Sequence, residues 1–443
     1  MVLRGVVAAG LRGLSTAQVR RVRPVRHGAA DGLVARVYRE LERDFGVLAP
    51  PVALHSPAPD VLAAVWLVLR ETLLVPGRAP RAVKEAVSTA VSEANRCPFC
   101  VTMHSSVLDD LVGRGASGGG GWGGASARRT GAGGAELGGA GAGRTSLGGA
   151  NAGGTGASGV NAVGAGAGAG GANPGDAGAG RTSAGGVNAG DAGAGRISAS
   201  GVNAGDAGGA GAGQVDAVGA EWAAAAEWAS AAAFAGSTVP APFPADQAPE
   251  VLGTAVVLHH LNRVVNLFLG PLPLPPGAPA ASMVVVRRVL VRLIKAAERG
   301  GPVRGASLDL LPEADLPADL GWAGGDPVLA DAFARAAGAL DAAGRRSVPV
   351  GARELVLERL AAWDGRAPGV SRAWVEDAVS GLPPAERAAG RLALLTALAA
   401  YQVDDAAVAA FRAVDGEDRA LVELTSWAST AAARRIGSWA PLP

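Results

Sequence analysis

Apolar side chains recur at helical spacing along most of the chain, outside one glycine-rich stretch. Between Asp31 and Phe45, apolar residues return every three or four positions, and Gly46 stands where such a helix would end. No segment shows the period-two alternation of a half-buried strand. The pattern therefore predicts an all-α fold. Further helices are expected at about 60–74, 80–95, 98–112, 249–269, 283–299, 327–343, 351–363, 371–380, 384–401, 404–414 and 418–439.

Proline and capping residues indicate where several of these helices begin. Pro80 is a good first-turn residue, and Pro98 should end one helix and open the next. Asp246 is expected to cap the long helix that starts near Pro249. Ordered structure is expected to resume near Ala220, after the glycine-rich stretch.

The glycine-rich stretch is predicted to be a disordered insert. Of the 67 Gly, 39 lie between Gly115 and Val218, and residues 175–189 are nearly repeated at 190–204. So many small and polar residues bury too little apolar surface to offset the entropy of chain ordering. The expected organisation is N-terminal helices at 1–114, the insert at 115–218, further helices at 219–300 and a C-terminal helical part at 301–443.

Charge and cysteine content restrict the classes of protein. Forty Lys and Arg against 39 Asp and Glu give a formal net charge of +1, so neither nucleic acid nor a membrane is expected as a partner. Two cysteines exclude a disulfide-stapled secreted scaffold. Arg4 and Arg12 interrupt the N-terminal apolar run, and no stretch approaches the length of a membrane-spanning helix. A cytoplasmic protein is therefore expected.

The two cysteines and a nearby histidine form the most specific chemical motif. Cys97, Cys100 and His104 fall on one face of a helix with 100° per residue. The start of a helix favours a thiolate, and a neighbouring imidazole is a base for the thiol proton. A second thiol three residues away lets an oxidised sulfur close to a disulfide. The motif predicts thiol redox chemistry.

Other polar residues are candidates for supporting this site. Glu85 and Glu93 share one face of the preceding helix, where either could relay a proton or be a solvated helix charge. On the long helix from Pro249, His260 or Arg263 could face the dithiol and support a thiolate, or could simply pack in the core.

The stretch KEAVSTAVSEANRCPFCVTMHSSVL resembles the core motif of the alkylhydroperoxidase D-like (AhpD-like) family, which shares its fold with the carboxymuconolactone decarboxylases. The family pattern is a glutamate 12 residues before Cys-x-x-Cys-x-x-x-His. The resemblance implies that Cys100 attacks the peroxide, Cys97 resolves the product, His104 is the base and Glu85 the relay acid. Phe99 replaces a second histidine that better-studied members carry.

The resemblance also implies the fold and the partners. It implies an AhpD-like helical bundle with peroxidase activity on a small hydroperoxide, no cofactor, and a dithiol reductant such as a lipoyl carrier. It further implies a homo-oligomer, with the glycine-rich tract inserted after the motif helix. The part at 301–443 would be a diverged, cysteine-free second half.

Several alternatives remain open on the sequence alone. A metal site could combine the Cys97, Cys100 and His104 side chains with Glu93 or His260, although structural zinc usually takes two separated ligand pairs. The dithiol could exchange disulfides without peroxidase activity. The chain could be a carboxymuconolactone-decarboxylase-like enzyme, or a non-enzymatic helical scaffold whose insert binds a partner.

Overall fold

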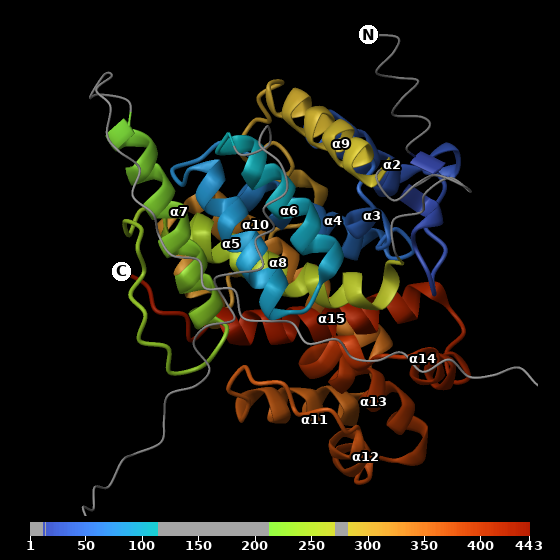
Figure 1. Ribbon diagram of the computed structural model, residues 1–443. Helices are drawn as coiled ribbons and strands as arrows, with labels where there is room; N and C mark the ends of the chain where they lie inside the picture. The colour runs from blue at the N-terminus through green and yellow to red at the C-terminus, as the bar shows by residue number, and fades with distance from the viewer. Residues whose placement is uncertain (1–11, 14, 114–211, 271–281) are drawn as a thin grey trace, which may run out of the picture. The chain divides into compact units, whose positions relative to one another are not determined.

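The computed structural model describes residues 12–13, 15–113, 212–270 and 282–443, and these residues fold into helices (Figure 1). Among them the structure has no β-strand, only an isolated bridge between Val19 and Leu269, so the all-α prediction is confirmed. The α-helices are α2 (Gly32–Asp44), α3 (Pro50–Ala53), α4 (Pro59–Leu69), α5 (Arg81–Ala94), α6 (Pro98–Leu111), α7 (Ala212–Ala232), α8 (Ala248–Phe268), α9 (Ser282–Glu298), α10 (Pro327–Ser347), α11 (Val350–Ala361), α12 (Ala373–Val379), α13 (Pro384–Ala399), α14 (Asp405–Arg412) and α15 (Asp418–Gly437).

Three differences from the predicted boundaries stand out: α7 begins earlier, α8 lacks the predicted cap, and α10 ends at Ser347 rather than near Ala343. Helix α7 begins at Ala212 rather than near Ala220, so the last seven residues of the predicted insert are helical. Gln247, not Asp246, is the N-cap of α8, and it makes no side-chain capping bond. The remainder of the insert, 114–211, lies outside the described residues.

Helix α8 lies at the centre of the described part of the chain. It packs against α5 on one side and α15 on another, and α5 in turn contacts α6 and α7. By length and composition α8 could cross a membrane, but 94% of its most apolar window is buried inside the protein. It is thus a core helix, and it holds α5, which carries Glu85.

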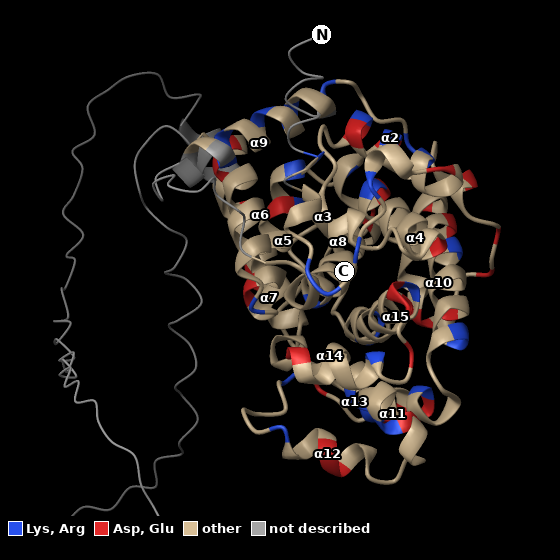
Figure 2. Ribbon diagram, turned by 90° about the vertical axis from the view of Figure 1, so that its right-hand side faces the viewer, with Lys and Arg blue, Asp and Glu red and all other residues tan. Residues whose placement is uncertain are grey.

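Helices after residue 301 pack directly on helices that precede it. Helix α10 lies against α4, and α15 lies against α8. The interpretation of 301–443 as a diverged repeat remains a prediction. Basic and acidic residues are interspersed over the described helices, in keeping with the near-zero net charge (Figure 2).

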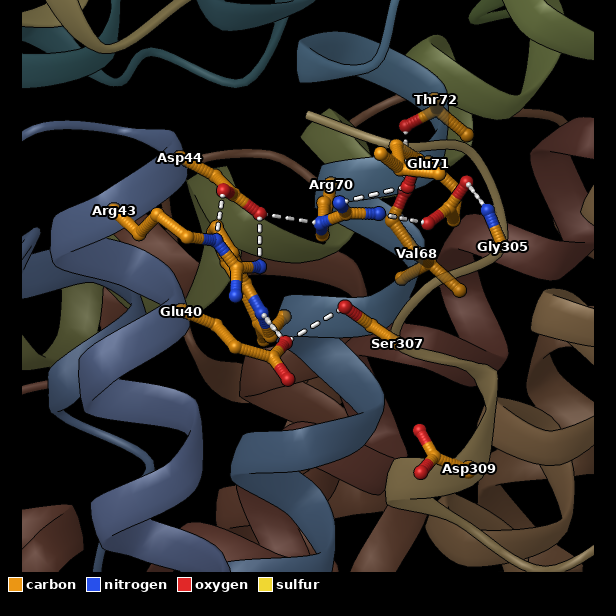
Figure 3. A network of polar contacts seen from close by, with 12 residues as sticks. Glu40, Arg43, Asp44, Val68, Arg70, Glu71, Thr72, Gly305, Ser307 and Asp309 are labelled. Carbon is orange, nitrogen blue, oxygen red and sulfur yellow. Dashed lines mark hydrogen bonds and ion pairs between the residues drawn. The ribbon is translucent and has the colours of Figure 1, made fainter. Parts of the chain in front are cut away.

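A buried ionic network joins the N-terminal helices to the segment after α9 (Figure 3). Arg70, which is fully buried, donates to Asp44 at 2.7 Å and to the carbonyl of Val303 at 2.8 Å, and pairs with Glu71. Glu71 in turn accepts from the backbone N–H of Gly305 at 3.0 Å. Arg70 and Glu71 lie in a π-helical turn, Arg70–Leu74, that continues α4. The network connects segments that are more than 230 residues apart in sequence.

Candidate active site

The candidate site lies at the junction of α5 and α6. Asn95 ends α5, and Arg96 adopts the left-handed conformation with φ of 53°, which costs a non-glycine residue conformational energy. The guanidinium of Arg96 lies 4.8 Å from the ring centre of Tyr401, and Cys97 N–H donates to Ser92 O at 2.9 Å. These contacts hold the strained turn that delivers Cys97 to the start of α6.

The two thiols are close together, as the spacing predicts. Cys97 is the N-cap of α6, Pro98 is its first residue, and Cys100 follows in the first turn. The Cys97 thiol donates to the Cys100 sulfur at 2.9 Å. Both are free thiols and both are buried, with exposed fractions of 1% and 4%. The pair is therefore placed for disulfide formation without rearrangement of the helix.

The electrostatic surroundings of Cys100 differ from the expectation. Burial raises the pKa of the Cys100 thiol well above its ordinary value, and the neighbouring Cys97 sulfur raises it further. The expected stabilisation of a thiolate at the helix start is thus outweighed by desolvation. Ionisation of this thiol requires a base that accepts its proton directly.

A histidine–glutamate pair lies one helical turn beyond Cys100. His104 Nδ1 donates to Glu85 Oε2 at 2.7 Å, across the packed faces of α6 and α5. Burial alone would raise the pKa of Glu85, but Arg81 and His104 outweigh it and lower the pKa. Arg81 lies one turn before Glu85 and donates to its Oε1 at 2.8 Å. Glu85 therefore remains an anion that orients the imidazole.

The structure distinguishes the two candidate carboxylates. Glu85 is 1% exposed and contacts His104, whereas the half-buried side chain of Glu93 makes no hydrogen bond or ion pair with another described residue. Burial raises the pKa of Glu93. Of the two candidate carboxylates, Glu85 is therefore the one that contacts the His104 imidazole.

The candidates on α8 have hydrogen-bond partners other than the thiols. The Nδ1 atom of His260 contacts Ser429 and Thr430 on α15, at 2.7 and 3.0 Å. Arg263 donates to the carbonyls of Ala397 and His259, at 2.9 and 2.7 Å. Neither residue makes a hydrogen bond to a thiol or to the Glu85–His104 pair.

A pocket of about 380 Å³ borders the site, and the Cys97 side chain forms part of its wall. Apolar side chains from α6 and α8 form most of this wall, and Arg287 of α9 is the one charged residue among the described residues that line it. We call it the Cys97 pocket. Its wall consists of Cys97, Pro98, Phe99, Thr102, Met103, Val265, Asn266, Leu269, Gly270 and Arg287.

No arrangement of metal ligands is formed by the described residues. No group of three or more His, Cys, Asp or Glu side chains is clustered so that it could hold an ion within this part of the structure. Glu93 and His260 were the two candidates for a fourth ligand. The Glu93 side chain is half-buried, and His260 contacts Ser429 and Thr430 on α15.

Comparison with known proteins shows to which family the chain belongs. No family model matches the chain, and no solved structure matches it. A curated protein of Mycobacterium tuberculosis (strain ATCC 25618 / H37Rv), named "Alkyl hydroperoxide reductase Rv2159c", is 32% identical over 424 residues. The match covers 95% of this chain and 94% of that protein. The chain belongs to the AhpD-like family.

Membership of the AhpD-like family rests on far more than the motif at 80–113, because the match extends over nearly the whole chain. Two residues of the site were not singled out from the sequence. Arg81 stands four residues before Glu85, a spacing that itself indicates an ion pair on one helix face. Asn95 donates to His259 Nδ1 at 2.8 Å, and no local spacing could have indicated a contact across 164 residues.

Proposed function

We propose that this protein is a dithiol peroxidase that reduces organic hydroperoxides at Cys97 and Cys100. One observation carries the proposal: the two sulfurs lie 2.9 Å apart, one turn from a histidine that is bonded to a buried glutamate at 2.7 Å. The name of the M. tuberculosis relative, an alkyl hydroperoxide reductase, supports the same class of reaction.

The proposed chemistry begins with the attack of a thiolate on the peroxide. His104 accepts the proton of Cys100, and the resulting thiolate attacks the terminal oxygen of ROOH. The O–O bond breaks, Cys100 becomes a sulfenic acid, and the departing alkoxide takes a proton to leave as ROH. Cys97 then attacks the sulfenic sulfur and water leaves, so two electrons from the two thiols reduce one peroxide.

Glu85 and Arg81 have supporting roles in this scheme. The Glu85 carboxylate accepts from His104 Nδ1, so the other ring nitrogen, Nε2, is the atom that can take a proton. Arg81 keeps the carboxylate ionised although it is 1% exposed. The pair thereby compensates for the raised pKa of the buried Cys100 thiol.

Return of the disulfide to the dithiol requires an external reductant. A dithiol such as a lipoyl group would attack one sulfur of the Cys97–Cys100 disulfide and form a mixed disulfide. Its second thiol would then displace the protein thiol, which leaves a cyclic disulfide on the reductant and two thiols on the protein. The wall of the Cys97 pocket is the proposed point of entry.

A second candidate is a thiol–disulfide oxidoreductase that does not act on peroxides. The observation in its favour is that Cys97, and not Cys100, forms part of the pocket wall, while the Cys100 thiol has a raised pKa. In that case dithiol exchange would be fast, and peroxide would oxidise the protein no faster than it oxidises free cysteine.

Turnover of cumene hydroperoxide by variants with one substitution in α6 tests the proposal. Cys100→Ser should abolish turnover, and His104→Asn should lower kcat/KM by roughly a hundredfold because the base is lost. Ser106→Ala, on the same helix, should leave turnover unchanged. Wild-type turnover in Cys100→Ser would contradict the mechanism, whereas absence of turnover in the wild type with fast dithiol exchange would favour the second candidate.

A further inference from the structure

The Cys97 pocket combines an apolar wall with a single positive charge. Phe99 and Met103 from α6 and Val265 and Leu269 from α8 supply the apolar part. Its volume of about 380 Å³ falls in the range of pockets that take small organic molecules, and far exceeds the space that one water or hydrogen peroxide molecule needs. The wall is therefore suited to a ligand with an apolar body.

Arg287 is the charged residue of this wall, and no acidic residue faces it there. The side chain is half-buried, and it makes no hydrogen bond or ion pair with any other residue that the structure describes. Arg20 donates to the carbonyl of the wall residue Leu269 at 2.9 Å, but its own side chain is not among the residues that line the pocket. A guanidinium that is partly removed from water without an acidic neighbour is a good partner for a carboxylate.

The polar side chains of the wall are already engaged with the backbone. Thr102 Oγ1 donates to Pro98 O at 2.8 Å, and the Asn266 amide donates to Asn95 O at 3.0 Å. Thr102 thus uses its one O–H on the backbone and Asn266 uses one of its two N–H groups, so Arg287 is the group of the described wall that can select for a negative charge.

We infer that the Cys97 pocket selects hydroperoxides that carry a carboxylate on an apolar body. The apolar body would lie on Phe99, Met103 and Leu269, the carboxylate would pair with Arg287, and the peroxide group would lie at the sulfurs. This inference rests on the proposed peroxidase activity and names its substrate class.

A matched pair of substrates tests the inference. Cumene hydroperoxide and its para-carboxylate differ only in the charged group. We expect the wild-type kcat/KM to be roughly tenfold higher for the carboxylate, and Arg287→Gln to bring the ratio of the two kcat/KM values close to one. Arg288→Gln, which changes an exposed neighbour on α9, should retain the preference. Equal rates for both substrates in the wild type, or an equal loss for both in Arg287→Gln, would overturn the inference.

A binding measurement separates this inference from the proposed function. Binding of 4-isopropylbenzoate, which has no peroxide group, is measured by calorimetry with the reduced wild-type protein and Arg287→Gln. Binding that depends on Arg287 supports the pocket assignment even if neither hydroperoxide is turned over, an outcome that would count against the peroxidase alone. Turnover of both hydroperoxides at equal rates, with no binding of the benzoate, would leave the peroxidase in place and reject the selectivity.

Discussion

At the scale of single residues, the site depends on whether each buried ionisable side chain has an oppositely charged neighbour that stabilises its charged form. The Cys100 thiol has a pKa raised by burial and by Cys97, whereas Glu85, equally buried, has a pKa lowered by Arg81 and His104. The spacing of these residues in the sequence predicted that they would form one site. It could not predict the sign of either shift, because desolvation depends on packing by helices that are distant in sequence.

The assignment of Glu85 as the relay acid predicts a specific loss in Glu85→Gln. The amide cannot orient and stabilise a protonated His104 as a carboxylate does, so kcat/KM for cumene hydroperoxide should fall by roughly a hundredfold. Glu93→Gln is the matched control on the same helix and should remain within about twofold of wild type, because Glu93 makes no contact with the site. Equal activities in the two variants would show that Glu85 has no catalytic role.

Buried histidines predict that the protein loses stability in acid. Burial lowers the pKa of His55 from 6.5 to about 4. Between these values the unfolded chain binds a proton that the folded protein does not, so stability is fully present above pH 6.5 and falls as the pH drops toward 4. His55 alone should contribute a slope of about 1.4 kcal/mol per pH unit in the lower part of this range. The free energy of unfolding, measured with urea at several pH values, should depend less steeply on pH in His55→Asn than in the wild type. An unchanged dependence on pH would contradict the assignment.

At the scale of elements, the α5–turn–α6 unit was predictable from local signals. Pro98 and the helical spacing of apolar residues fixed both helices to within a residue or two, and this placed Cys97 at the cap. The turn itself was not predictable. Arg96 is held in a left-handed conformation by contacts that include Tyr401, which lies in the C-terminal part of the chain.

The network around Arg70 predicts a large effect on stability from one substitution. Arg70→Met removes the buried cation that Asp44 and Glu71 share and leaves Asp44 paired only with the more exposed Arg43, so the free energy of unfolding should fall by about 3–5 kcal/mol. Arg43→Met is the matched control, since Arg43 pairs with the same Asp44 but its side chain is 59% exposed. It should cost less than about 1 kcal/mol in denaturant unfolding at neutral pH. Similar losses in both variants would show that burial of Arg70 is not decisive.

At the scale of the whole molecule, the described residues on either side of the glycine-rich stretch belong to one compact unit. Helix α5 contacts both α6, which precedes the stretch, and α7, which follows it. The sequence predicted an all-α body interrupted by an insert, but it could not show which helices meet across it, because no local pattern records such contacts.

Deletion of residues 123–207 should therefore leave the helical body folded. The flanking residues 114–122 and 208–211 would remain as the connection between α6 and α7. We expect a melting temperature within a few degrees of wild type and two titratable thiols after denaturation, because the described core lies entirely outside the deletion. Loss of cooperative unfolding would show that this segment is needed for the fold. Retained peroxidase turnover with loss of a bound partner would instead identify the segment as an interaction arm.

Peptide mass spectrometry after a single addition of hydroperoxide tests the central claim most directly. Reduced wild-type protein treated with one equivalent of cumene hydroperoxide should form a Cys97–Cys100 disulfide, with one peroxide consumed per disulfide. In Cys97→Ser, the same treatment should leave a sulfenic acid on Cys100 that dimedone traps. Peroxide consumption without a disulfide, or oxidation no faster than that of free cysteine, would contradict the account.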